Sequence, residues 1–141
     1  MKESNQQTEN ESSVEMRIVR LDNDKTRRVD GSDRVYDVYF EMEGSAPQSW
    51  GTIFEGEWKL LNVAHPDLWQ AARVDRSFLI MRCPLDDVVA LHLPFLKKAV
   101  ATTNVKYAQY ARVIAKERSA QRLIWERESS AVEAVARLAA L

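Results

Sequence analysis

The chain has 141 residues, of which 45% are hydrophobic and 29% are charged, and its formal net charge at pH 7 is −1. These values are ordinary for one folded domain of a soluble protein. Cys83 is the only cysteine and there are two histidines, which excludes an intramolecular disulfide and a structural zinc site with paired cysteines. We therefore expect no metal and no cofactor.

Residues 1–13 form a polar segment rich in glutamate, glutamine, asparagine and serine. Such a composition buries too little apolar surface to offset the entropy lost on ordering, so we expect a disordered tail. It also lacks the apolar stretch of a signal peptide, and no segment of the chain is apolar enough to span a membrane. The sequence thus predicts a cytoplasmic protein that does not bind membranes.

Residues 14–84 are predicted to form an α+β core that begins with strands. Residues 14–20 alternate apolar and charged side chains, as a half-buried strand requires. A short strand is expected at 26–29. The clearest strand covers 34–42 and turns four apolar side chains toward the core: Tyr36, Val38, Phe40 and Met42.

A helix is expected at about 46–61. Ser45 can cap it and Gln48 can reach back in a capping box, while Pro47 is tolerated in the first turn. Gly56 lies inside this helix, which suggests that another backbone passes close to it. The apolar stripe recurs at three- and four-residue spacing and consists of Trp50, Ile53, Phe54, Trp58 and Leu61. We expect this Trp-rich helix to cover one face of the sheet.

A hairpin at about 69–83 completes the core. Residues 69–74 and 77–83 read as two strands around a tight turn at Asp75-Arg76, and Pro84 closes the second strand. The predicted fold class is α+β, with a small and mainly antiparallel sheet of three to five strands.

Residues 85–141 are predicted to be a long helical arm. Asp86 or Asp87 can cap its start, and Pro94 should either kink the helix or restart it. After Pro94, 47 residues contain no glycine or proline. A continuous helix of that length would reach about 70 Å at 1.5 Å per residue, whereas a compact chain of this size has a radius of gyration of about 14 Å. The arm should therefore pair with another chain or break and fold back.

An apolar stripe along the arm favours association, and the alternative is a break near Ser130, where residues 130–133 have a capping-box pattern. Glu117, Gln121 and Glu128 interrupt the stripe and would fix the register of a paired helix. The members of the stripe are Leu96, Val100, Thr103, Tyr107, Tyr110, Ile114, Val132, Val135 and Ala139.

The charge distribution along the chain is uneven. Residues 1–96 carry 11 Lys+Arg against 17 Asp+Glu, a net charge of −6, and residues 97–141 carry 9 against 4, a net charge of +5. This split favours association of the arm with an acidic surface, which could belong to another copy, to an acidic protein or to nucleic acid.

These patterns predict a non-enzymatic assembly protein that forms a homodimer or a higher oligomer. The predicted interface residues are Leu96, Val100, Tyr107, Tyr110, Ile114 and Ile124, with Arg112, Lys116, Arg118 and Arg122 as the charged rim. The alternative is a nucleic-acid-binding accessory protein that uses the same four basic residues.

Candidate catalytic residues are few. Cys83 with His92 could serve as a nucleophile and a base, and His65 could act as a base beside Asp67. For Cys83 a buried structural role is the favoured interpretation, because free cysteine is among the most buried residue types. For His65 the favoured interpretation is an ordinary loop histidine. The sequence contains no glycine-rich phosphate loop, no nucleophile elbow and no paired-histidine metal helix. We predict no catalytic residue.

Overall fold

The computed structural model describes residues 14–68 and 71–140. The chain divides after Ala108 into two compact units, residues 1–108 and residues 109–141. The predicted disordered tail at 1–13, and Trp69 and Gln70 at the start of the predicted hairpin, lie outside the described residues.

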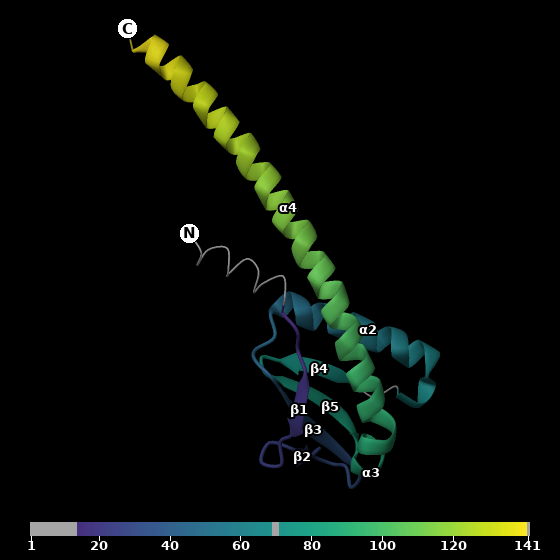
Figure 1. Ribbon diagram of the computed structural model, residues 1–141. Helices are drawn as coiled ribbons and strands as arrows, with labels where there is room; N and C mark the ends of the chain where they lie inside the picture. The colour runs from purple at the N-terminus through teal and green to yellow at the C-terminus, as the bar shows by residue number, and fades with distance from the viewer. Residues whose placement is uncertain (1–13, 69–70, 141) are drawn as a thin grey trace. The chain divides into compact units, whose positions relative to one another are not determined.

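The first unit contains a five-stranded antiparallel sheet (Figure 1). Four strands lie in the order β1-β3-β5-β4. The short strand β2 also pairs with β3, at Tyr36 and Asp37, whereas β1 pairs with the later residues of β3. This confirms the α+β class and the small antiparallel sheet. The strands are β1 (Ile18–Leu21), β2 (Arg27–Arg28), β3 (Val35–Met42), β4 (Ala72–Asp75) and β5 (Phe78–Pro84).

The first strand begins later than its alternating pattern predicts. Residues 14–17 are not part of the strand, although Met16 is buried. The backbone N–H and C=O of Met16 bond instead to the side chain of Asn104, a residue 88 positions away. The Arg17 carbonyl still accepts a hydrogen bond from the Glu43 backbone N–H at 2.9 Å, so the backbone pairing reaches Arg17 and Asn104 holds the residue before it.

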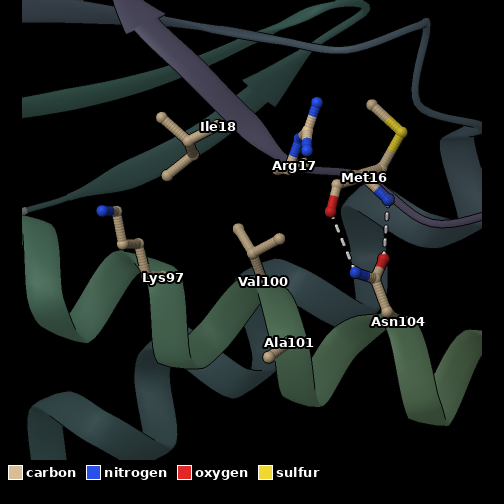
Figure 2. Close-up of a pocket in the computed structure, with 7 residues that line it drawn as sticks. All are labelled: Met16, Arg17, Ile18, Lys97, Val100, Ala101 and Asn104. Carbon is tan, nitrogen blue, oxygen red and sulfur yellow. Dashed lines mark hydrogen bonds between the residues drawn. The ribbon is translucent and has the colours of Figure 1, made fainter.

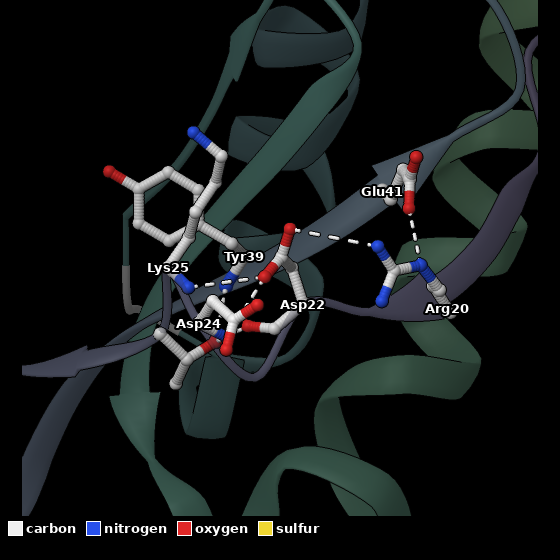
Figure 3. Close-up of polar contacts among 7 residues, drawn as sticks. Arg20, Asp22, Asp24, Lys25, Tyr39 and Glu41 are labelled. Carbon is white, nitrogen blue, oxygen red and sulfur yellow. Dashed lines mark hydrogen bonds and ion pairs between the residues drawn. The ribbon is translucent and has the colours of Figure 1, made fainter.

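A compact turn connects β1 to β2 (Figure 3). The buried carboxylate of Asp22 accepts hydrogen bonds from the backbone N–H groups of Asp24 and Lys25, at 2.9 and 3.1 Å. The Thr26 hydroxyl donates to the Asp22 carbonyl and accepts from the backbone N–H of Tyr39, which ties the turn to β3. Arg20 pairs with Glu41 across the same corner. Asp22 can be buried because its carboxylate accepts hydrogen bonds from the backbone of its own turn.

The predicted Trp-rich helix is α2 (Gln48–Ala64), which begins two residues later and ends three residues later than expected. Pro47 is its N-cap residue and no side chain caps it, so the predicted capping box of Ser45 and Gln48 is wrong. Trp50, Phe54 and Trp58 are buried, and the Phe54 ring stacks at 5.7 Å from Trp50 and 6.4 Å from Trp58. A short 3-10 turn, η1 (Pro66–Leu68), follows.

The close backbone approach on α2 occurs at Gly51, and the expectation for Gly56 is wrong. A Cβ atom built on Gly51 would lie 3.4 Å from Cβ of Val74 on β4, whereas one on Gly56 would meet nothing within 4 Å. A contact of 3.4 Å is within ordinary van der Waals range, so α2 lies close to β4 at Gly51.

The hairpin turn between β4 and β5 lies at Arg76 and Ser77, one residue later than predicted. Arg76 has a φ of 56°, in the left-handed region that few residues with a side chain adopt. The described part of the predicted first strand reduces to Ala72–Asp75.

The long C-terminal helix begins in three steps (Figure 1): α3 (Leu85–Asp87), a π-helical turn η2 (Val88–His92), and α4 (Leu93–Ala139). Neither Asp86 nor Asp87 caps it, since Pro84 is the N-cap residue of α3 and makes no side-chain cap bond. Pro94 lies in the first turn of α4, where its missing N–H is tolerated, and the wider π-helical turn precedes it. At the other end α4 continues through Ser130, so the alternative with a break there is wrong.

The two faces of the sheet differ in burial. Val38, Phe40 and Met42 on β3 are buried together with Leu79 and Met81 on β5, and their register places them on one face. The other face carries Asp37 opposite Arg82, whose guanidinium donates two hydrogen bonds to the carboxylate, at 2.9 and 3.1 Å. This ion pair holds the pKa of Asp37 below its usual value of 3.8.

We expect Asp37→Asn to lower the free energy of unfolding at pH 7 by at most about 1 kcal/mol, because Arg82 is half exposed and exposed ion pairs contribute little. A lowered folded-state pKa stabilises the fold above pH 3.8 and ceases to do so as the pH falls through the folded value. The difference between the variant and the original protein should therefore vanish in acid. Urea titrations at pH 7 and at progressively lower pH measure it, and a difference that does not shrink as the pH falls below 3.8 would contradict this origin.

Candidate interaction surface

Part of the predicted interface belongs to the protein's own core. Leu96, Val100 and Tyr107 on the first turns of α4 are at most 7% exposed, as is Thr103 between them. All four lie in the first unit. The prediction that Leu96, Val100 and Tyr107 contact a partner chain is therefore corrected: these positions carry the apolar stripe because this part of α4 is packed in the first unit.

Asn104 connects this part of α4 to two other segments. Its Oδ1 accepts hydrogen bonds from the Met16 backbone N–H at 2.9 Å and from Trp50 Nε1 at 3.0 Å, and its Nδ2 donates to the Met16 carbonyl at 2.9 Å. No sequence pattern indicated this residue, because the partners of a single asparagine lie far away along the chain.

The second unit contains one helical segment, residues 109–139 of α4. Its large apolar side chains are between 45% and 71% exposed: Tyr110, Val113, Leu123, Ile124, Trp125, Val132, Val135 and Leu138. Ile114 is half-buried. A single helix has no second element against which to bury such residues, and apolar area left in water is unfavourable.

Four of these exposed residues, Tyr110, Ile124, Val135 and Leu138, lie on a heptad row that includes part of the apolar stripe predicted from the sequence. From Tyr110 to Leu138 the spacing alternates between four and three residues without interruption, as it does in helices that pack side by side. We call the nine residues of this row the seam: Tyr110, Ile114, Glu117, Gln121, Ile124, Glu128, Ala131, Val135 and Leu138. Val113, Ala120, Trp125 and Val132 border it and widen the apolar face.

The seam contains three polar residues, Glu117, Gln121 and Glu128. Each seam glutamate has an arginine next to it in the sequence, Arg118 after Glu117 and Arg127 before Glu128, and both arginines occupy positions that border the seam. The seam thus carries negative charges at its centre and positive charges at its edge.

The outer side of this segment has mixed charge. Arg122 pairs with Glu126 and Arg137 pairs with Glu133, each across 3.8 Å and one helical turn. Arg112, Lys116, Arg118 and Arg122, the predicted charged rim, are all exposed. Acidic residues between the basic ones reduce the attraction of this side for a phosphate backbone.

The suggested nucleophile does not have the properties that it would need. Cys83 is fully buried, and burial, together with the nearby Asp87 carboxylate, raises the pKa of its thiol to about 12. A thiol is a nucleophile only as the thiolate, so Cys83 is inert at neutral pH.

The two histidines are in different environments. His92 is buried, its Nδ1 donates to the Asp87 carbonyl at 3.2 Å, and its Nε2 has no hydrogen-bond partner among the described residues. His65 is exposed and its ring lies 4.7 Å from that of Phe95. These contacts connect both side chains to the packing around the start of α4.

Within residues 14–68 and 71–140, no helix is both long and apolar enough to cross a membrane, and no group of three or more potential ligand side chains is placed to hold a metal ion. Comparisons with protein-family models, curated proteins and solved structures gave no match.

Proposed function

We propose that this protein is a non-enzymatic assembly protein whose copies associate through the seam on residues 109–139 of α4. The observation that carries the proposal is the seam, a row of nine residues at uninterrupted heptad spacing of which six are apolar, on a helical segment that forms a unit by itself and leaves most of its large apolar side chains exposed. An isolated helix gains little stability from its own hydrogen bonds and most from packing an apolar face. A second copy supplies a matching face.

The charges along the seam support pairing between identical chains. In a parallel pair, a residue of the seam packs beside the bordering residues of the other helix. Glu117 is then next to Arg118 of the partner subunit, and Glu128 is next to Arg127 of the partner subunit. The cations neutralise the two seam glutamates, which limits the repulsion between identical helices.

A dimer is the simplest assembly, because one row of seam residues makes one self-complementary contact. The apolar residues that border the seam, among them Val113 and Trp125, widen the contact and also suit a bundle of more than two helices. An acidic protein is a further candidate partner of this helical segment, because residues 97–141 carry a net positive charge.

Multi-angle light scattering after size-exclusion chromatography tests the proposal. The chain has a mass of 16.2 kDa, and we expect an integral multiple of that mass which falls toward 16.2 kDa on dilution. A constant mass of 16.2 kDa up to the highest soluble concentration would overturn the proposal. Salt-sensitive retention on heparin, lost on Arg118→Ala and Arg122→Ala, would favour the nucleic-acid alternative instead.

A further inference from the structure

A groove lies between the start of β1 and the first turns of α4 (Figure 2). It is wholly within the first unit and has a volume of about 380 Å³. Its lining residues are Met16, Arg17, Ile18, Lys97, Val100, Ala101 and Asn104. The volume is in the range of pockets that hold small ligands or a few residues of a peptide.

One wall of the groove consists of Met16, Arg17 and Ile18, where the strand β1 begins. β1 is the terminal strand, pairs only with β3, and has no other strand partner among residues 14–68 and 71–140. At Met16, before the strand begins, both backbone groups are already bonded to Asn104, so the edge that can accept an incoming extended chain is that of Ile18–Leu21. The side chain of Val19 on this strand is exposed.

The other wall supplies an apolar surface and a charge. Ile18 and Val100 point into the space between strand and helix (Figure 2), and Ala101 also lines the groove. Lys97 lies at one end and makes no ion pair with any described residue, whereas Arg17 is already paired with Glu43 at 2.8 Å. None of the seven lining residues is acidic. The groove is therefore apolar inside and positive at its rim.

The groove is also held open in advance. Asn104 fixes the backbone of Met16 through two hydrogen bonds, at 2.9 Å each, and receives a third from Trp50 (Figure 2). These bonds hold the residues just before β1 at a fixed distance from α4. A preformed site loses less entropy on binding than a site that must first be ordered.

We propose that this groove binds an extended acidic peptide segment of another protein, which adds a strand to the free edge of β1. Strand addition draws affinity from main-chain hydrogen bonds and specificity from alternate side chains. One apolar side chain of the peptide packs on Val100 and Ala101, and a neighbouring carboxylate pairs with Lys97. This site is separate from the seam and does not depend on self-association.

The test uses the full-length protein labelled with ¹⁵N and a capped hexapeptide of alternating glutamate and valine. We expect saturable shifts of the amide signals of residues 17–21 and 97–104, with a dissociation constant below about 1 mM. A peptide N-methylated at alternate amides keeps its charge but cannot donate a strand ladder, and we expect no saturable shifts with it. Equal binding of both peptides, or shifts confined to other residues, would overturn the proposal.

Two substitutions locate the site. Ala101→Glu places a bulky anion in the groove at an exposed helical position, and we expect it to weaken binding at least about tenfold. Ala136→Glu makes the same change on an exposed turn of the same helix outside the groove, and should leave the affinity unchanged. Lys97→Gln should weaken binding about threefold, and added salt should reduce that difference. Equal affinities for the Ala101→Glu and Ala136→Glu variants would contradict the assigned site.

Discussion

Replacing Ile124 by glutamate is expected to reduce the assembly to a 16.2 kDa monomer at micromolar concentration. Ile124 lies in the middle of the seam and is half exposed in the single chain. In an associated pair it is buried, so the substitution places an additional carboxylate from each chain in an apolar contact. Burying an uncompensated charge costs several kcal/mol, and about 3 kcal/mol is enough to weaken association more than a hundredfold.

Ser119→Glu is the matched control for this change. It introduces the same charge on the same helix, but Ser119 is five residues from Ile124 and lies on the side away from the seam. We expect its mass by light scattering to equal that of the original protein. The helical signal in circular dichroism should fall for Ile124→Glu and not for Ser119→Glu, because the freed segment is a marginally stable helix. Retention of the full assembly by Ile124→Glu would show that the seam is not the contact.

Trp50→Ala is expected to lower the free energy of unfolding by about 3–5 kcal/mol, the range for removal of a buried aromatic side chain. Trp50 is fully buried, stacks on Phe54, and donates its indole N–H to Asn104 at 3.0 Å. The substitution therefore leaves a cavity between α2, α4 and the sheet and removes one of the three hydrogen bonds at Asn104. The total free energy of unfolding of a domain of this size is only a few times larger than this loss.

Two further tryptophan substitutions separate the contributions. Trp50→Phe keeps an aromatic ring in the core but removes the indole donor, and we expect a loss of about 1–3 kcal/mol. Trp125→Ala removes a tryptophan that is 66% exposed, and should change the stability of the dilute monomer by no more than about 0.5 kcal/mol. Urea unfolding followed by circular dichroism at low concentration measures all three. Similar losses for Trp50→Ala and Trp125→Ala would contradict the packing described here.

The apolar stripe of α4 illustrates how one pattern serves two purposes. Residues at three- and four-residue spacing continue from Leu96 past Tyr110. Those up to Tyr107 are buried within the first unit, and those after it are exposed apart from the half-buried Ile114. Periodicity reports which side of a helix is apolar. It does not indicate which residues pack against that side, because those residues lie in segments distant in the sequence.

The groove between β1 and α4 was not predicted for a related reason. Its residues belong to two short segments, around Met16 and around Val100, that are more than 80 positions apart. Neither segment has a motif of its own. The pair of hydrogen bonds between Asn104 and Met16 brings them together, and a contact of that kind depends on the register of the whole sheet against the helix.

The sequence by itself determined the fold class, the clearest strand at Val35–Met42, the Trp-rich helix and the continuous helical character after Pro94. These follow from local periodicity and from the absence of helix breakers, which act over a few neighbouring residues. Only the tertiary structure decided that Leu96, Val100 and Tyr107 are core, that Gly51 is the point of close approach, and that Met16 bonds to Asn104. The physical reason is that burial and hydrogen-bond pairing are set by contacts between residues far apart in the chain, and a local pattern carries no information about its distant partner.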